Sequence, residues 1–142
     1  MNSANGRWTC PRCSRSFGRA NRPHTCLPAL AVETYFAGRS PAQRRVYDAV
    51  VDHMQELDGV DIEAVSVGIL IKRARTFAEL RPQRSWFVLS VLLPRAVAHP
   101  RIKRTSPGGA RRVAHFIDLR DAADVDDDVR AWLTEAYMDA SP

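Results

Sequence analysis

The sequence predicts an α+β fold, in which an antiparallel sheet is flanked by an N-terminal and a C-terminal helix and is preceded by a small segment that holds every cysteine. Two amphipathic patterns, one after Ser40 and one after Asp124, have helical spacing, whereas residues 62–119 between them have the pattern of strands separated by turn residues. Strands and helices do not alternate, and no glycine-rich phosphate motif is present, which argues against a Rossmann or P-loop fold.

The length of 142 residues allows one domain of about 110 residues beside the cysteine segment, enough to bury a core. The longest apolar run, residues 86–93, contains Ser90 and is far too short to span a membrane. The first seven residues, MNSANGR, contain no apolar signal core. We therefore expect a cytoplasmic protein that does not bind membranes and whose thiols stay reduced.

Residues 8–26, WTCPRCSRSFGRANRPHTC, contain all three cysteines and one of the four histidines, with the spacing C-x2-C-x10-H-x-C. Pro11 stiffens the turn between the first two thiolates, so that both reach one ion. The pattern predicts one structural Zn²⁺ per chain, held by four ligands: Cys10, Cys13, His24 and Cys26. A filled tetrahedron leaves no position for water or substrate, so the site is not hydrolytic.

Two alternatives to zinc are a disulfide pair with a spare thiol and a redox C-x-x-C motif. The odd number of cysteines argues against the first, and the lack of a strand-then-helix context around Cys10 argues against the second. The close H-x-C pair leaves the subtype of zinc finger open. The predicted organisation is a zinc-finger segment at 1–27, a linker at 28–39 and an α+β domain at 40–142.

The helical elements have clear sequence boundaries. A one-turn helix is expected at 32–37 and ends at Gly38. Residues 40–43 form a capping box with proline at the first helical position, and this box begins a helix that runs to about residue 57, before Asp58 and Gly59. His53 lies off the apolar stripe of this helix and is expected to be solvated.

Strands are expected at 62–67, 69–72, 76–80 and 86–93, with a bend at Gly68. The nearly continuous apolar run at 86–93 predicts a central strand covered on both faces. Residues 101–105 and 111–119 flank the turn Pro107-Gly108-Gly109 and predict a hairpin in which Val113, His115, Ile117 and Leu119 share one face. His115 is expected to be half-buried, with a local hydrogen-bond partner.

The last helix is predicted to be capped by Asp124, with further aspartates in its first turn, where the helix dipole favours negative charge. Its apolar stripe, which we expect to pack on the sheet, consists of Val129, Trp132, Leu133, Ala136 and Tyr137. The acidic run thus has a structural explanation and is not interpreted as a metal site.

The net charge of +5 is unevenly distributed. Residues 1–26 hold five arginines and no acid, whereas residues 118–142 hold two basic and eight acidic groups. The candidate nucleic-acid-binding residues are Arg12, Arg15, Arg19, Arg22, Lys72 and Arg73. Two alternatives remain open: the finger arginines stabilise zinc thiolates, and residues 72–75 are charges that keep an edge strand from aggregating.

No catalytic constellation stands out. No cysteine remains after zinc binding, and the serines lack the context of a nucleophile elbow. His99, His115 and Asp118 are the remaining combination, but two histidines and an acid occur in most domains of this size. We therefore do not expect an enzyme.

Four segments together resemble a known family: the stretch at 8–26, VSVGILIKRARTFAELRP, LPRAVAHPRI and DVDDDVRAWLTEAY. They are similar to bacterial proteins of a family catalogued as a domain of unknown function, numbered 5655, and the likeness covers nearly the whole chain. The resemblance supports the finger and the domain boundary but implies no activity. Relatives look as though they occur beside other modules, including nuclease-like ones, which points weakly to nucleic acid.

Two functional hypotheses follow. In the first, the chain is a non-catalytic accessory module that binds DNA or RNA through phosphate contacts, with weak sequence preference. In the second, it is a regulatory module that binds a ligand or a protein, and the zinc finger is a docking element. Aromatic side chains among the basic groups would favour the first, and in the sequence only Trp8 and Phe17 meet this criterion.

Overall fold

A computed structural model of the chain describes residues 8–9, 16–17 and 32–142. The four predicted zinc ligands lie outside these residues, so the ligand set stays a prediction. The helices are α1 (Val32–Phe36), α2 (Pro41–Met54), the 3-10 helix η1 (Ala122–Asp124) and α3 (Asp127–Asp139). The strands are β1 (Trp8–Thr9), β2 (Ser16–Phe17), β3 (Asp61–Val65), β4 (Gly68–Lys72), β5 (Thr76–Pro82), β6 (Phe87–Leu93), β7 (Ile102–Pro107) and β8 (Val113–Leu119).

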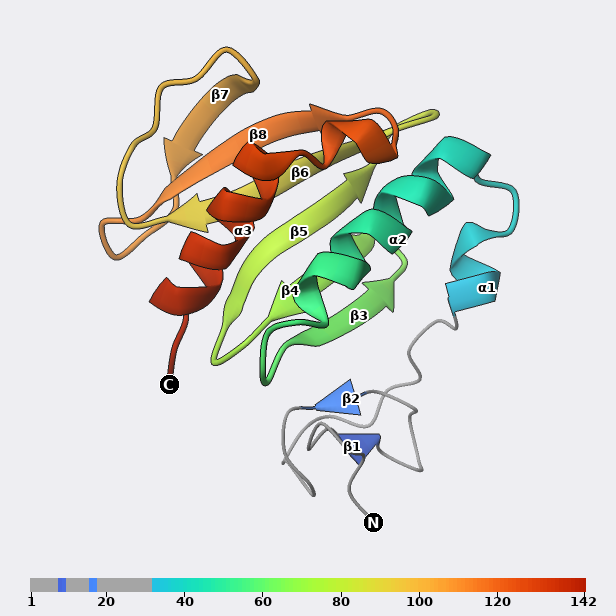
Figure 1. Cartoon of the computed structure of the whole chain (residues 1–142), viewed down its shortest axis with the longest axis horizontal. Coiled ribbons are helices and arrows are strands. Elements are labelled where there is room, and N and C mark those ends of the chain that lie inside the picture. Colours follow the sequence, from blue (N-terminus) through green and yellow to red (C-terminus); the bar gives the residue numbers. More distant parts are fainter. Residues whose placement is uncertain (1–7, 10–15, 18–31) are drawn as a thin grey trace.

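Strands β3 to β8 form one six-stranded sheet in the order β3-β4-β5-β6-β8-β7, and every neighbouring pair is antiparallel. β1 and β2 form a separate antiparallel pair, and β2 contacts β3. Helices α2 and α3 lie on the same face of the six-stranded sheet (Figure 1). The prediction of an antiparallel sheet flanked by an N-terminal and a C-terminal helix is therefore confirmed.

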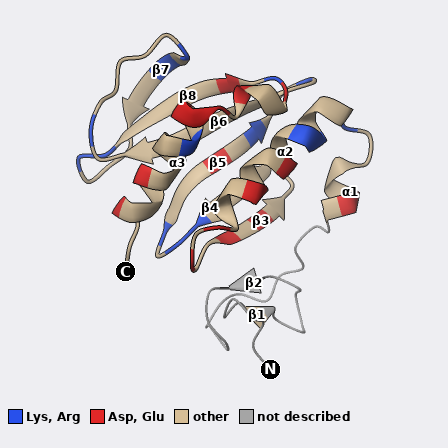
Figure 2. Ribbon diagram, in the orientation of Figure 1, with Lys and Arg blue, Asp and Glu red and all other residues tan. Residues whose placement is uncertain are grey.

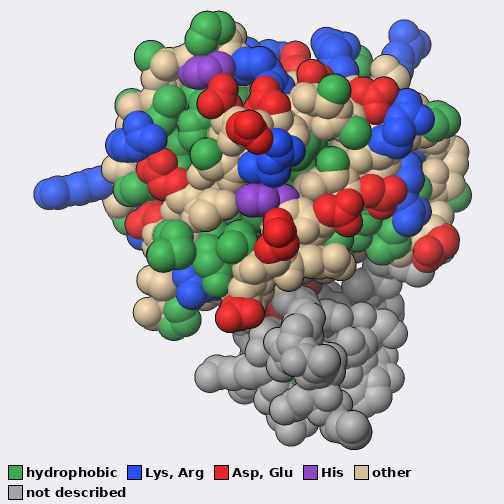
Figure 3. Space-filling model, viewed as in Figure 1, with side chains coloured by type: hydrophobic (Ala, Val, Ile, Leu, Met, Phe, Trp, Pro, Cys, Tyr) green, Lys and Arg blue, Asp and Glu red, His purple; other side chains and the backbone are tan. Residues whose placement is uncertain are grey.

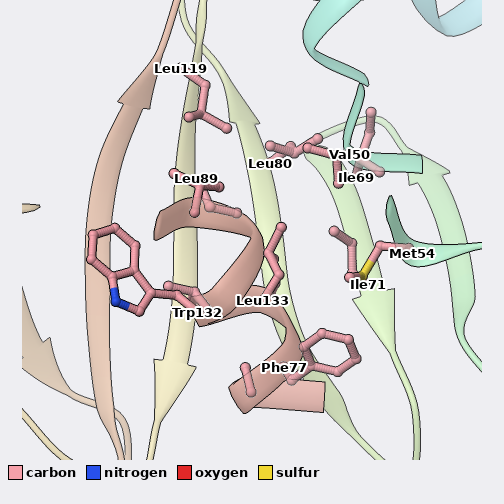
Figure 4. Packing of buried hydrophobic residues seen from close by; sticks show 14 of the residues in the cluster. Val50, Met54, Ile69, Ile71, Phe77, Leu80, Leu89, Leu119, Trp132 and Leu133 are labelled. Atoms are coloured by element: carbon pink, nitrogen blue, oxygen red, sulfur yellow. The ribbon is translucent and has the colours of Figure 1, made fainter. Parts of the chain in front are cut away.

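The core lies between the two helices and the sheet. Val50 and Met54 of α2 pack over β4, while Leu133 of α3 lies over the middle of the sheet (Figure 4). Met54 and Leu133 are fully buried, as is Leu89 of β6. Burial of this size stabilises each such side chain by about 1.5–3 kcal/mol, which explains why both amphipathic helices pack on one sheet face.

Helix α2 begins as its sequence predicts. The backbone N–H of Gln43 donates to Ser40 Oγ at 3.1 Å, and the N–H of Ser40 donates to Gln43 Oε1 at 3.0 Å, which completes the capping box. Gly38 and Gly59 have φ angles of 80° and 75°, a region that side-chain-bearing residues rarely adopt. These two glycines therefore separate α2 from the elements before and after it.

The predicted cap of the last helix is corrected by two residues. Asp126, not Asp124, is the N-cap of α3, and its Oδ1 accepts the N–H of Val129 at 3.0 Å. Asp124 instead ends η1, where its Oδ2 accepts the N–H of Arg120 at 2.8 Å. A run of aspartates offers several possible caps, and the short η1 helix decides between them.

Strand β6 is central, but it is not covered on both faces. Phe87, Leu89, Val91 and Leu93 are fully buried, whereas the residues that alternate with them are only half-buried. The prediction was wrong on this point because both helices pack on the same side of the sheet. The other side of β6 therefore belongs to an open surface.

Candidate functional site

The sheet face turned away from α2 and α3 is the candidate site, and we call it the open face (Figure 1). Strand register assigns its residues, because the side chains that alternate with the buried core residues point to this side. Its members include Asp61, Glu63, Leu70, Lys72, Glu79, Arg81, Trp86, Val88, Ser90, Leu92, Lys103, Arg104, Ser106, Ala114, Phe116, Asp118 and Arg120.

The open face carries five cationic and four carboxylate side chains. Helices α2 and α3 together carry six carboxylates and three arginines. The ribbon in Figure 2 shows acidic residues along both helices, and in Figure 3 Asp and Glu side chains are interspersed with Lys and Arg on the helix-covered face. The open face thus has an excess of one cation, whereas α2 and α3 together have an excess of three carboxylates.

A shallow hollow of about 310 Å³ lies on the open face. Its lining combines hydroxyl and apolar groups, including Thr76, Ser90, Leu92, Ser106, Ala114 and Phe116. Phe116 forms part of the floor, because it sits on β8 opposite Ser90 of β6 and Arg104 of β7. The hollow is open to solvent, since it spans the exposed surface of neighbouring strands.

Phe116 is covered by an arginine. The guanidinium carbon of Arg104 lies 3.7 Å from the centre of the Phe116 ring, and that of Arg81 lies 6.0 Å from it. Phe116 itself is only 6% exposed, so the guanidinium of Arg104 is the outer layer. Within the described part of the chain, Arg104 has no acidic partner, whereas Arg81 pairs with Glu79 at 2.9 Å.

A second arginine lies over an aromatic ring at the other end of β8. The guanidinium carbon of Arg120 is 4.2 Å from the centre of the Trp86 ring. The indole N–H of Trp86 donates to Asp118 Oδ1 at 3.3 Å, and Lys103 Nζ donates to both carboxylate oxygens of Asp118 at 3.2 Å. Asp118 therefore holds Trp86 and Lys103 in place. Arg120 makes only a long contact with Asp118, with 3.7 Å between Arg120 Nη2 and Asp118 Oδ2.

Two predicted nucleic-acid-binding residues are described, and both already have partners. Lys72 lies on the open face, with its Nζ 3.3 Å from Glu63 Oε1. Arg73 follows β4 in the turn to β5, where it donates to Tyr137 O at 3.1 Å and lies 4.0 Å above the Tyr137 ring. The other four residues, Arg12, Arg15, Arg19 and Arg22, lie outside the described residues.

The edge-strand explanation for residues 72–75 is wrong. β4 lies between β3 and β5 in the sheet, and residues 73–75 form a turn closed by an Arg73 N–H to Arg75 O bond of 3.0 Å. Arg75 reaches the end of α3, where it donates to Asp139 Oδ2 at 3.1 Å. These arginines therefore tie the β4–β5 turn to α3.

The three histidines in the described part of the chain have structural partners. His53 is not solvated as predicted, because its Nε2 lies 2.8 Å from Thr134 Oγ1 and joins α2 to α3. His115 is fully buried rather than half-buried, and it holds the segment before β7 by accepting the N–H of Val97 at Nε2, at 3.0 Å. His115 Nδ1 lies 2.9 Å from Val113 O, which is the local partner that the sequence predicts.

The combination of His99, His115 and Asp118 is not assembled. His99 Nε2 lies 3.2 Å from Asp128, His115 lies on the core face of β8, and Asp118 lies on the open face. Within residues 32–142 and the two short strands, no group of three metal-ligating side chains is close enough to hold an ion. None of the helices in the same part of the chain has the length and apolarity that a membrane span requires.

The sequence did not identify Trp86, Arg104, Phe116 or Arg120 as site residues. Alternation along 113–119 places Phe116 opposite the predicted core face, and this signal was available. The approach of Arg104 to Phe116 could not be predicted from the sequence, because the register between β7 and β8 shifts between Ile102 and Arg104. A local irregularity of this kind decides which β7 side chain reaches the ring.

A family model described as Domain of unknown function (DUF5655) matches residues 32–140. The match begins with α1 and ends one residue after α3, so it covers the six-stranded sheet and both large helices. It does not include the cysteine-containing segment, so the likeness is limited to this part of the chain. No curated protein and no solved structure matches the sequence.

Proposed function

We propose that this chain, which belongs to the family described as Domain of unknown function (DUF5655), is a non-catalytic module that binds nucleic acid with weak sequence preference. The observation that carries the proposal is the pair of arginine–aromatic stacks on the open face, Arg104 over Phe116 and Arg120 over Trp86. Aromatic rings among basic groups are typical of sequence-tolerant nucleic-acid binders. The excess of carboxylates on α2 and α3 repels phosphate, so the open face is the side of the sheet that should turn toward a nucleic acid.

The N-terminal segment supplies a second part of the proposal. We propose that Cys10, Cys13, His24 and Cys26 hold one structural zinc ion and that the nearby arginines add phosphate contacts. The spacing of the ligands supports the metal, and the paired strands β1 and β2 stand on either side of the C-x2-C motif in the sequence. Zinc would be structural here, since four protein ligands complete its tetrahedron.

The test is a fluorescence-anisotropy titration of the full chain with labelled oligonucleotides, single-stranded and duplex, over a series of salt concentrations. Three or four phosphate contacts give a slope of log K against log salt of about −2 to −3 for a single strand and about −3 to −4 for duplex DNA. The variant Arg81→Gln/Lys103→Gln removes two open-face charges and should weaken binding and flatten the slope by one to two units, as about −0.7 to −0.9 is lost per contact.

The matched control is Arg44→Gln/Arg95→Gln, which removes two exposed arginines whose partners, Asp48 and Glu135, lie on α2 and α3. It should leave both affinity and slope close to those of the unchanged protein. Equal losses in the two double variants would show that only net charge matters. No binding at low salt to either oligonucleotide would reject the proposed function.

That last result would favour the second candidate, a regulatory module. Its support is the hollow on the open face, whose serine hydroxyls and apolar floor suit a small ligand better than a phosphate chain. In that case, the zinc segment would be a docking element for a protein.

A further inference from the structure

We infer that the open face binds an unpaired strand of nucleic acid, whose bases stack on the guanidinium groups of Arg104 and Arg120. The inference rests on the proposed function and adds to it the kind of nucleic acid and the mode of contact. The ligand chemistry is an unpaired base beside a phosphodiester, which single-stranded DNA and RNA share. Bases stack on the planes of arginine guanidinium groups as well as on aromatic rings.

Arg104 is suited to this role because it packs on Phe116 and has no carboxylate partner in the described part of the chain. Its guanidinium is backed by a buried ring at 3.7 Å, so the side chain is already ordered before any ligand binds. The residue is exposed, and within the described part of the chain no carboxylate competes for it. A base that stacks on Arg104 therefore meets a cation in a fixed position.

Other arginines over rings lack this combination. Arg73 over Tyr137 and Arg39 over Tyr35 each donate to a backbone carbonyl, at 3.1 and 3.0 Å. Arg44, over Phe36 and Tyr47, pairs with Asp48 at 3.1 Å. Each of these arginines has a hydrogen-bond or ion-pair partner within the fold, so these stacks stabilise the fold. Arg104 differs because, among the described residues, none accepts a hydrogen bond from its guanidinium.

Arg120 provides the second position. Its side chain is 60% exposed, its guanidinium lies over Trp86, and its contact with Asp118 is long, at 3.7 Å. Trp86 is fixed by its own hydrogen bond to Asp118. Arg120 thus presents an exposed guanidinium over a positioned ring, as Arg104 does.

The spacing of the two positions distinguishes a single strand from a duplex. Phe116, which carries Arg104, and Arg120 are four residues apart in an extended chain, so their Cα atoms are about 13 Å apart. Successive bases in a duplex strand are about 3.4 Å apart and already stacked on each other, so they present edges rather than faces. An unpaired strand has free faces and reaches both arginines by spreading its bases.

Asp118 lies between the two arginines and affects the path of the strand. Its carboxylate repels phosphates, so the backbone should run beside Asp118 and not across it. Replacing Asp118 by Asn keeps an oxygen acceptor for Trp86 and removes the negative charge. We therefore expect Asp118→Asn to bind a single strand more tightly, by a few fold.

The experiment compares Arg104→Lys with Arg44→Lys in the full chain, by anisotropy titration with oligothymidylate, with the RNA of the same sequence, and with a hairpin duplex. Lysine keeps the charge but has no plane on which a base can stack. Arg104→Lys should weaken single-strand binding about five- to hundredfold, the range for the loss of one stacked base, and leave duplex binding unchanged. Arg44→Lys, the same change on α2, should alter neither.

Thermal melting of each variant shows whether it folds, and an abasic oligomer of the same length measures phosphate binding alone. If Arg104→Lys folds and binds oligothymidylate as the unchanged protein does, the inference is overturned while the proposed function stands. If the unchanged protein binds the abasic and normal oligomers equally, stacking is likewise excluded. Failure of every oligomer to bind removes the proposed function together with the inference. A higher affinity for oligothymidylate than for the RNA, or the reverse, would show whether single-stranded DNA or RNA is the preferred ligand.

Discussion

Gln43 shows how one side chain joins two parts of the fold. It completes the capping box of α2, and its Nε2 also donates to the carbonyl oxygens of Gln83 and Trp86, both at 3.0 Å. Gln43 is only 1% exposed. It therefore fixes α2 to the β5–β6 turn, which contains Trp86 directly before β6.

Glutamine and glutamate are interchangeable in a capping box, so the sequence alone predicts that Gln43→Glu is neutral. The structure predicts otherwise, because a carboxylate at this position faces two carbonyl oxygens and cannot donate. We expect the free energy of unfolding in urea to fall by about 1–3 kcal/mol. Gln83→Glu, at an exposed side chain, is the control and should change little. A neutral Gln43→Glu would show that the two bonds to the turn contribute nothing.

At the scale of elements, ion pairs connect the helices to the ends of the strands. Arg45 of α2 donates to both oxygens of Asp121, at 2.8 and 2.9 Å, and Asp121 caps η1 after β8. The hydrogen bond from Arg45, with a further one from the N–H of Ala122, lowers the pKa of Asp121 to about 2. Asp121 thus joins α2 to the segment that leads from β8 to α3.

A carboxyl group whose pKa is lowered by folding stabilises the fold above its unfolded pKa of about 3.9, and this contribution is lost as the pH falls toward the folded value. We expect Asp121→Asn to lower Tm by a few degrees at most near neutral pH, because the pair is exposed. The difference from the unchanged protein should shrink between about pH 4 and pH 2. A difference in Tm that is constant over this range would assign the effect to η1 capping alone.

The same elements show which parts of the fold could be predicted from the sequence. Local signals placed α2, α3 and the β7–β8 hairpin, because capping residues, apolar periodicity and turn glycines act within a few residues. The exposure of one side of β6 did not follow, since an apolar run does not reveal whether one or both faces are covered. The pairing of β6 with β8 and the register shift between β7 and β8 depend on residues that are far apart in the sequence. The approach of Arg104 to Phe116 follows from this pairing and this shift, so the sequence did not predict it.

At the scale of the whole molecule, the family match and the core coincide. The match starts at residue 32, and Tyr35 of α1 is buried in the same core as α2 and α3. Part of the predicted linker at 28–39 therefore packs on the domain. Residues 32–142 contain this core, and the zinc segment is proposed to depend on its metal.

This division predicts the outcome of Cys13→Ser. The variant should lose zinc, measured by elemental analysis, because three ligands no longer complete the site. The melting transition of the α+β domain should stay within a few degrees of that of the unchanged protein, and a chain that begins at Val32 should show the same transition. If protein purified without chelator contains no zinc, the proposed metal site is wrong. If the shortened chain fails to fold, the division is wrong.

We propose that nucleic acid binds on the open face of the sheet, where Arg104 and Arg120 lie. The most direct measurement is a titration of the full, isotope-labelled chain with an oligothymidylate at low salt, followed by the arginine Nε–H signals in NMR spectra. We expect the signals of Arg104 and Arg120 to shift in proportion to saturation, while those of Arg44 and Arg45 on α2 do not. Shifts confined to the α2 arginines, or saturable binding that leaves Arg104 and Arg120 unchanged, would contradict it.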